Sequence, residues 1–256
     1  MHLFSKIFSK PVIFTTLLAA VFSTAQADFI YAPGNAETTE GGANNTTPFS
    51  AGSSFYPSQT VRFQQVYNSS LFGAGTPVLI SAVSFRHDTA NSPSALNAVI
   101  SQLKLSFGVS SIYSEDNLSL TFADNLGANP AVVYDSSYTY NYAGSFAQPR
   151  PWSLKFNFTA PFFYSPASGN LILDVQTLGV SSGSIPTFDA ASVGGDGISR
   201  VRALDVNALT GVATSIGLVT QFEVTPIPEP GVSALLALGV AGLLLRRKTS
   251  KWSSTS

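Results

Sequence analysis

The feature that most constrains the fold of this chain is a series of short segments in which apolar and polar residues alternate. In residues 99–107, for example, Leu103, Leu105 and Phe107 share one face, as expected of a half-buried strand. Clusters of Gly, Pro, Asn and Ser separate the segments, and no amphipathic helix of four turns is present. The stretch 115–125 tolerates a helix but is short. The clearest strand segments are residues 61–67, 78–85, 99–107, 152–158, 171–175, 199–204 and 218–224.

About ten short strands with aromatic faces predict an all-β body, a single antiparallel two-sheet sandwich of jelly-roll type, over residues 58–225. The alternative is two small β domains divided near residues 142–151, although no biased linker occurs there. Residues 28–57 are poor in hydrophobic residues and rich in Gly, Asn, Thr and Ser. This composition predicts a low-complexity lead-in or a long edge loop.

The N-terminus has the three parts of a secretory signal peptide. Lys6 and Lys10 are followed by the apolar residues 11–22 and by a small-residue site at 25–27. We therefore predict a signal peptide at residues 1–27, removed by signal peptidase after export, and a mature N-terminus near Asp28.

The C-terminus reads as a second targeting segment over residues 226–256. The rigid tripeptide Pro228-Glu229-Pro230 precedes an uncharged run at 231–245, and the basic pair Arg246 and Arg247 opens the tail at 246–256. The run is short for one transmembrane helix, which needs about 20 residues. The long side chain of Arg246 can reach the membrane surface and so makes up part of the missing length. A buried core helix and a plain membrane anchor are the alternatives to a sorting signal.

This C-terminus resembles that of the PEP-CTERM proteins of exopolysaccharide-producing Gram-negative bacteria. The resemblance extends more loosely to residues 62–67, 83–86, 121–127, 161–164, 169–175 and 218–222. It implies processing by an exosortase, a membrane-embedded cysteine transpeptidase, acting on an inner-membrane precursor that then reaches the cell surface or extracellular matrix. The processing residues that match are Pro228, Glu229, Pro230, Arg246 and Arg247. The tail after Lys248 is longer than is usual for the family.

Charge narrows the class of partner. Between the two targeting segments lie 7 Lys and Arg, against 14 Asp and Glu up to Glu229, so the exported part carries a net charge of about −7. This charge speaks against nucleic acid or anionic lipid as a partner and allows calcium or basic or neutral polymers. The alternative is that the charge only keeps the exported protein in solution. The absence of cysteine removes thiol nucleophiles and requires a fold that is stable without disulfides.

No residue pattern singles out a catalytic site. His87 stands beside Asp88, but no Gly-x-Ser-x-Gly elbow exists, and His87 is expected at the surface where a strand ends. Asp189 with residues 194–197 has the look of a calcium loop but lacks the alternating aspartates, so a β-turn is favoured. We therefore predict no catalytic residues, no cofactor and no metal. A glycoside hydrolase needs two carboxylates, and the candidates are Glu115, Asp116, Asp174, Asp189 and Asp196. Their spacing does not single out a catalytic pair.

Tyr138, Tyr140 and Tyr142 recur at every second position, which places them on one face of a strand. An exposed stripe of rings would bind glycans by stacking, whereas the alternative is that the rings form sheet core. The resulting hypothesis is a non-enzymatic structural, glycan-binding or protein-binding component of an exopolysaccharide biofilm matrix. The alternative is a secreted hydrolase or lyase that acts on that polysaccharide.

Overall fold

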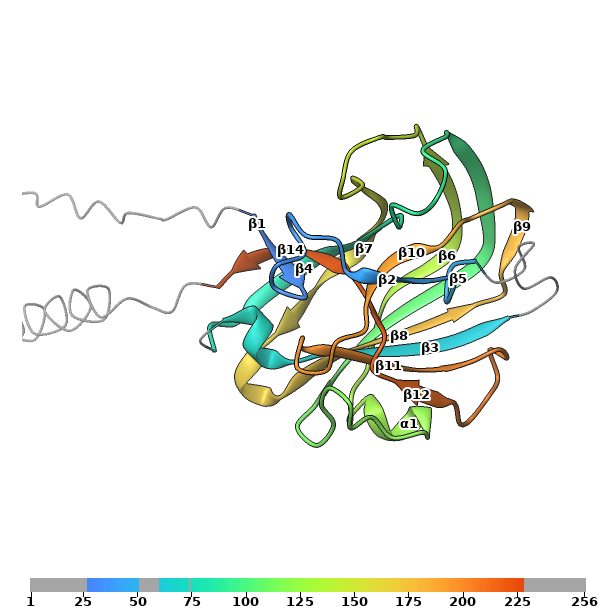
Figure 1. Cartoon of the computed structure of the whole chain (residues 1–256). Coiled ribbons are helices and arrows are strands. Elements are labelled where there is room, and N and C mark those ends of the chain that lie inside the picture. The colour runs from blue at the N-terminus through green and yellow to red at the C-terminus, as the bar shows by residue number, and fades with distance from the viewer. Residues whose placement is uncertain (1–26, 51–59, 74, 228–256) are drawn as a thin grey trace, which may run out of the picture.

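The computed structural model describes residues 27–50, 60–73 and 75–227, and almost all regular structure in them is β-strand (Figure 1). Short helices occur at η1 (Ser69–Phe72), α1 (Phe122–Asn125) and η2 (Pro166–Ser168). The strands are β1 (Asp28–Ala32), β2 (Gly42–Asn45), β3 (Val61–Tyr67), β4 (Val78–Arg86), β5 (Leu96–Ser110), β6 (Ala131–Tyr142), β7 (Trp152–Tyr164), β8 (Asn170–Thr177), β9 (Val180–Gly183), β10 (Phe188–Ala191), β11 (Ile198–Ala203), β12 (Val212–Thr214), β13 (Gly217–Leu218) and β14 (Thr220–Pro226).

The described residues form three antiparallel sheets, which confirms the all-β prediction. One has the order β1-β14-β4-β7, and the largest has the order β12-β11-β3-β8-β5-β6 with β9 added beside β5. The third, β13-β10-β2, corrects the expectation of two sheets. The chain passes from this sheet to the four-stranded sheet at Val219, which lies between β13 and β14 and whose N–H donates to the carbonyl of Asp189 (3.0 Å).

The two larger sheets face one another through aromatic side chains. Phe107 of β5 lies 5.5 Å from Phe158 of β7, and Tyr67 of β3 meets Phe222 of β14 edge to face at 4.8 Å between ring centroids. The alternation in β5 buries Leu103, Leu105 and Phe107 completely, as the sequence predicts. Residues before and after 142–151 contribute to the same hydrophobic core.

The first described residues belong to the fold and are not a lead-in outside it. β1 pairs with β14, β2 pairs with β10, and the Phe49 ring is fully buried against Phe85 and Phe188. Backbone pairing and the burial of one large ring stabilise this segment within the fold, although its average hydrophobicity is low. The expectation of a lead-in or edge loop over residues 28–57 is therefore corrected for residues 28–50.

Both targeting segments fall mostly outside the described residues. The predicted signal peptide is described only at Ala27, and the tripeptide 228–230, the span 231–245 and the tail 246–256 are not described. Among the residues that are described, none belongs to a helix with the length and apolar character needed to cross a membrane.

Candidate functional site

Three carboxylates from separate parts of the chain meet beside the small sheet. Glu40 precedes β2, Asp88 follows β4, and Asp189 lies within β10. One oxygen from each lies within 4.8 Å of the others, and Asp88 and Asp189 are buried. Carboxylates at this separation repel one another, so the fold needs a cation or protons there.

Arg86, the last residue of β4, provides that positive charge. Its Nη2 lies 2.6 Å from Asp189 Oδ2, and Nε donates to the same oxygen at 2.8 Å. The guanidinium also donates to the carbonyls of Ala36 (2.7 Å) and Thr39 (2.6 Å), and it stacks 4.8 Å above the Trp152 ring. Arg86 thereby fixes the loop before β2 to β10.

The pKa values of the cluster reflect burial. Burial raises the pKa of Asp189 to about 6, with a further contribution from nearby Glu40, while the bonds from Arg86 act in the opposite direction. Burial also raises the pKa of Asp88. An all-oxygen donor set is of the kind that Ca²⁺ prefers. However, the guanidinium already holds Asp189, so the geometry is that of a structural ion pair.

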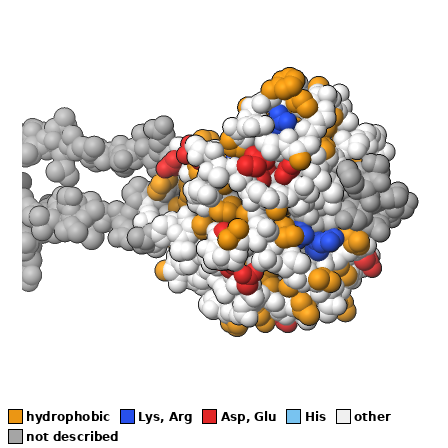
Figure 2. Space-filling model, in the orientation of Figure 1, with side chains coloured by type: hydrophobic (Ala, Val, Ile, Leu, Met, Phe, Trp, Pro, Cys, Tyr) orange, Lys and Arg blue, Asp and Glu red, His pale blue; other side chains and the backbone are white. Residues whose placement is uncertain are grey.

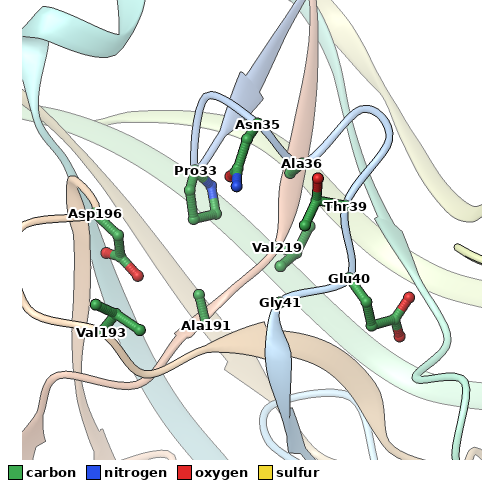
Figure 3. Close-up of a pocket in the computed structure, with 10 residues that line it drawn as sticks. All are labelled: Pro33, Asn35, Ala36, Thr39, Glu40, Gly41, Ala191, Val193, Asp196 and Val219. Atoms are coloured by element: carbon green, nitrogen blue, oxygen red, sulfur yellow. The ribbon is translucent and has the colours of Figure 1, made fainter.

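A shallow pocket of about 300 Å³ opens next to this cluster (Figure 3). Its apolar lining includes Ala191 and Val219, and Asn35 and Thr39 bring polar groups to one side. Asp196 approaches from the opposite side, while the carboxylate of Glu40 points away from Asp196. A mainly apolar surface with a few polar groups is suited to a small hydroxylated ligand.

The turn at residues 194–197 binds a carboxylate and not a cation. Glu115 accepts hydrogen bonds from the N–H groups of Gly195 (2.6 Å), Asp196 (2.8 Å) and Gly197 (2.9 Å). A calcium loop directs oxygens inward, whereas this one directs N–H groups inward. Asp189 is separately engaged by Arg86, and residues 194–195 form a turn, so the geometry favours the β-turn interpretation over a calcium loop.

Asp196 is the exceptional carboxylate of this turn. Oδ1 accepts from the N–H of Ile198 (3.0 Å), and Oδ2 is buried with no hydrogen-bond partner among the described residues. Burial, followed by the proximity of Glu115, raises the pKa of Asp196 to about 6.

The hypothesis of an exposed tyrosine stripe is wrong for two of its three members. Tyr140 and Tyr142 of β6 are buried, and Tyr138 packs partly buried against Phe156 of β7 at 4.7 Å between ring centroids. The shared face predicted by the alternation is turned toward β7. The rings therefore form sheet core, which was the alternative interpretation.

His87 is also misplaced by the sequence prediction, because only 1 % of it is exposed. Its Nε2 lies 2.7 Å from the hydroxyl of Tyr140, which is 2.8 Å from Oγ of Ser153. Burial, with a smaller effect of Arg150, lowers the pKa of His87 to about 4, so the ring is neutral at pH 7. Asp88 accepts from the N–H of Ala90 (2.7 Å) instead of orienting the imidazole.

Sequence reasoning missed the Arg86–Asp189 pair and the pocket, because their residues are far apart in the chain. The available signal was a mostly apolar strand that ends in an arginine, since a buried arginine needs a partner.

The described chain ends where the predicted C-terminal segment begins. β14 reaches Pro226, which pairs with Val78 of β4, and the N–H of Ile227 donates to the carbonyl of Pro77 (2.9 Å). The sorting residues Pro228, Glu229, Pro230, Arg246 and Arg247 lie outside the described residues.

Comparison with known proteins gives one match, to a family model described as the PEP-CTERM protein-sorting motif, over residues 226–248. No curated protein and no solved structure matches the chain. Such a motif indicates an exported, cell-surface-targeted protein that is processed by exosortase, a membrane-associated sorting enzyme. The chain is therefore a protein that carries a PEP-CTERM sorting signal, and residues 226–248 are that signal.

Proposed function

We propose that this chain is a non-catalytic component of an exopolysaccharide matrix, exported as an inner-membrane precursor and released to the cell surface or matrix by an exosortase. In this role the β-sheet body acts as a structural or binding module, and the ends of the chain serve its delivery. The single observation that carries the proposal is the match at residues 226–248, which starts within β14. Since β14 lies between β1 and β4, the signal follows directly on a central strand of the folded body, and the body is the part that it delivers.

The engagement of the carboxylates supports a role without catalysis. Asp189 is bound to Arg86, and Asp174 accepts hydrogen bonds from Gln64 (2.7 Å) and Arg62 (3.4 Å). A glycosidase needs one carboxyl group free to donate a proton and a second free to act as nucleophile or base. Carboxylates already committed to the fold suit a structural role better.

The charge of the exported part supports a neutral or basic polymer as the ligand. Seven basic and 14 acidic residues leave a net charge of about −7. On the face shown in Figure 2 the acidic side chains lie at several separate places. The pocket lined by Asn35, Thr39 and Asp196 is the candidate contact for a sugar, because polar side chains there can form hydrogen bonds with its hydroxyl or amino groups.

The sorting step is tested by replacing Pro228, Glu229 and Pro230 together with alanine. We expect the full-length protein to accumulate in the inner membrane of a strain that contains the transpeptidase. A matched control replaces Ser253 and Ser254, which lie outside the matched segment, and should be processed normally. Export of the triple variant at normal size would show that the tail is only an anchor.

The binding role is tested by retention of the purified mature protein on polysaccharide from the producing organism. We expect retention that weakens in Asp196→Ala and is unchanged in Lys155→Ala, a substitution on the four-stranded sheet. No retention of the parent protein would refute a glycan-binding role.

A hydrolase or lyase is the second candidate, favoured by the pKa of about 6 at Asp196 on an open pocket. A carboxyl group with such a pKa can serve as a general acid near neutral pH. Release of reducing ends from the native polymer, abolished in Asp196→Asn, would establish this activity and overturn the non-catalytic proposal.

A further inference from the structure

Both ends of the described chain meet at one end of the four-stranded sheet (Figure 1). Asp28 at the start of β1 pairs with Val224, and Pro226 at the end of β14 pairs with Val78, which in turn pairs with Tyr164 at the end of β7. We call this region the exit end. It comprises residues 27–29, 69–73, 75–77, 163–170 and 224–227.

The exit end lies close to the apolar run of the sorting signal. Ile227 is fixed to Pro77 by a hydrogen bond of 2.9 Å, so only residues 228–230 separate the body from Gly231. An extended chain spans at most about 3.6 Å per residue, and a proline-rich one about 3.1 Å. The four steps from Ile227 to Gly231 therefore cover about 12–14 Å, whereas the headgroup layer is about 5–8 Å thick on each side of a bilayer.

The surface of the exit end is suited to contact with lipid. Asp28 is the one charged residue among these, and the neighbouring Glu223 is paired with Lys155, whereas the exported part carries about −7 in total. An acidic body is repelled by anionic headgroups, so the end with few charges is the part that can approach them at least cost.

Two exposed aromatic rings flank the departing strand. Phe29 on β1 is 46 % exposed and Phe163 on β7 is 57 % exposed. Phe29 pairs directly with Glu223 of β14. Phe163 pairs with Leu79 of β4, and Leu79 pairs in turn with Thr225 of β14, two positions after Glu223. Side chains alternate between the two faces along β14, and those of Phe222 and Val224 are buried. Glu223 and Thr225 therefore face outward, and the two rings that lie level with them do so as well.

We propose that the exit end rests on the surface of the lipid bilayer in the membrane-held precursor, with the rings of Phe29 and Phe163 in the headgroup region. The inference depends on the proposed function, in which residues 231–245 span the membrane. Bilayer contact holds the body in one orientation and leaves the pocket side free of lipid. Aromatic side chains are enriched at this depth of the membrane.

The chain has no cysteine, so single-cysteine variants report single sites. We would introduce Phe29→Cys or Phe163→Cys into the precursor in a strain that lacks the transpeptidase. The matched control is Phe146→Cys: Phe146 is 87 % exposed and precedes the opposite end of β7. In membrane vesicles with the body exposed, a bulky, charged maleimide should label Phe29→Cys and Phe163→Cys about tenfold more slowly than Phe146→Cys, because lipid excludes the reagent. Detergent should speed the labelling of Phe29→Cys and Phe163→Cys and leave that of Phe146→Cys unchanged, because only the first two sites lose a lipid cover.

The outcomes separate this inference from the proposed function. A precursor that sodium carbonate extracts from the membrane would overturn the proposed function and with it the inference. A precursor that stays in the membrane while all three sites are labelled equally fast would overturn the bilayer contact alone. Protection that appears only when the transpeptidase is present would show contact with that protein, and would likewise overturn the bilayer proposal.

Discussion

Replacement of Arg86 by methionine tests the buried cluster most directly. Arg86 and Asp189 are 1 % and 0 % exposed, and the variant leaves the carboxylate and the carbonyls of Ala36 and Thr39 without their donor. Loss of one partner of a buried ion pair costs about 3–5 kcal/mol. For a body of roughly 200 residues each kcal/mol shifts Tm by about 2–4 °C, so we expect Tm to fall by about 6–20 °C.

The chain provides a control that differs mainly in burial. Lys155 and Glu223 form an ion pair at the same N–O distance of 2.6 Å, but their side chains are 44 % and 28 % exposed. Water screens such a pair, so Lys155→Met should cost less than about 1 kcal/mol. Thermal unfolding followed by circular dichroism at pH 7 compares the two variants. Equal effects of Arg86→Met and Lys155→Met would refute the reasoning.

The pH dependence provides a second check on Arg86→Met. The pKa of Asp189 is already raised to about 6 from an ordinary value of 3.8, and loss of the guanidinium raises it further. The folded state then binds more protons than the unfolded state, so stability rises as pH falls from 7 toward 5. Asp189→Asn, added to Arg86→Met, should remove this pH dependence and leave only the cost of the unpaired carbonyls, about 1–3 kcal/mol. An unchanged pH profile in the double variant would show that another group titrates.

Three further substitutions have definite expected outcomes. The pKa of Asp196 is raised in the folded state, so ionisation of its carboxyl group destabilises the fold as pH rises from about 4 to 6. Asp196→Asn should therefore be more stable than the parent protein by about 1 kcal/mol above pH 6 and equally stable below pH 4. Urea unfolding at pH 7 and pH 4 measures the difference. Tyr140→Phe leaves Nε2 of buried His87 without its partner and should cost about 1–3 kcal/mol in the same assay, whereas no loss would show that the hydroxyl is not needed. A Cβ added at Gly108 would overlap the carbonyl of Leu126, so Gly108→Ala should lower Tm by several degrees, and an unchanged Tm would mean that the loop can move away.

The strand segments were predictable because alternation is a local property. The segments predicted at 61–67, 78–85 and 99–107 correspond to β3, β4 and β5, and the buried face of β5 is the predicted one. β1 and β2 were missed because they are only five and four residues long and lie in a segment of low average hydrophobicity, and they are held by pairing with β14 and β10, which are distant in the sequence. Pairing of that kind leaves no local pattern.

The tyrosines show the limit of periodicity. A period of two places Tyr138, Tyr140 and Tyr142 on one face, but it does not decide whether that face meets solvent or another sheet. Packing against β7 buried Tyr140 and Tyr142. His87, expected at the surface as a strand-end residue, was buried by the rings of Tyr142 and Phe188 from other strands.

The sequence by itself determined the β character of the body and the sorting signal at residues 226–248. Both depend on patterns of neighbouring residues: alternating apolar and polar side chains in the body, and two prolines, an uncharged run and a basic tail in the signal. Only the tertiary structure decided that Arg86 forms an ion pair with Asp189, 103 positions away, and that the two ends of the described chain meet at one end of the four-stranded sheet. These features arise from pairing between distant strands, and the free energy that selects the pairing comes from burial of the whole core.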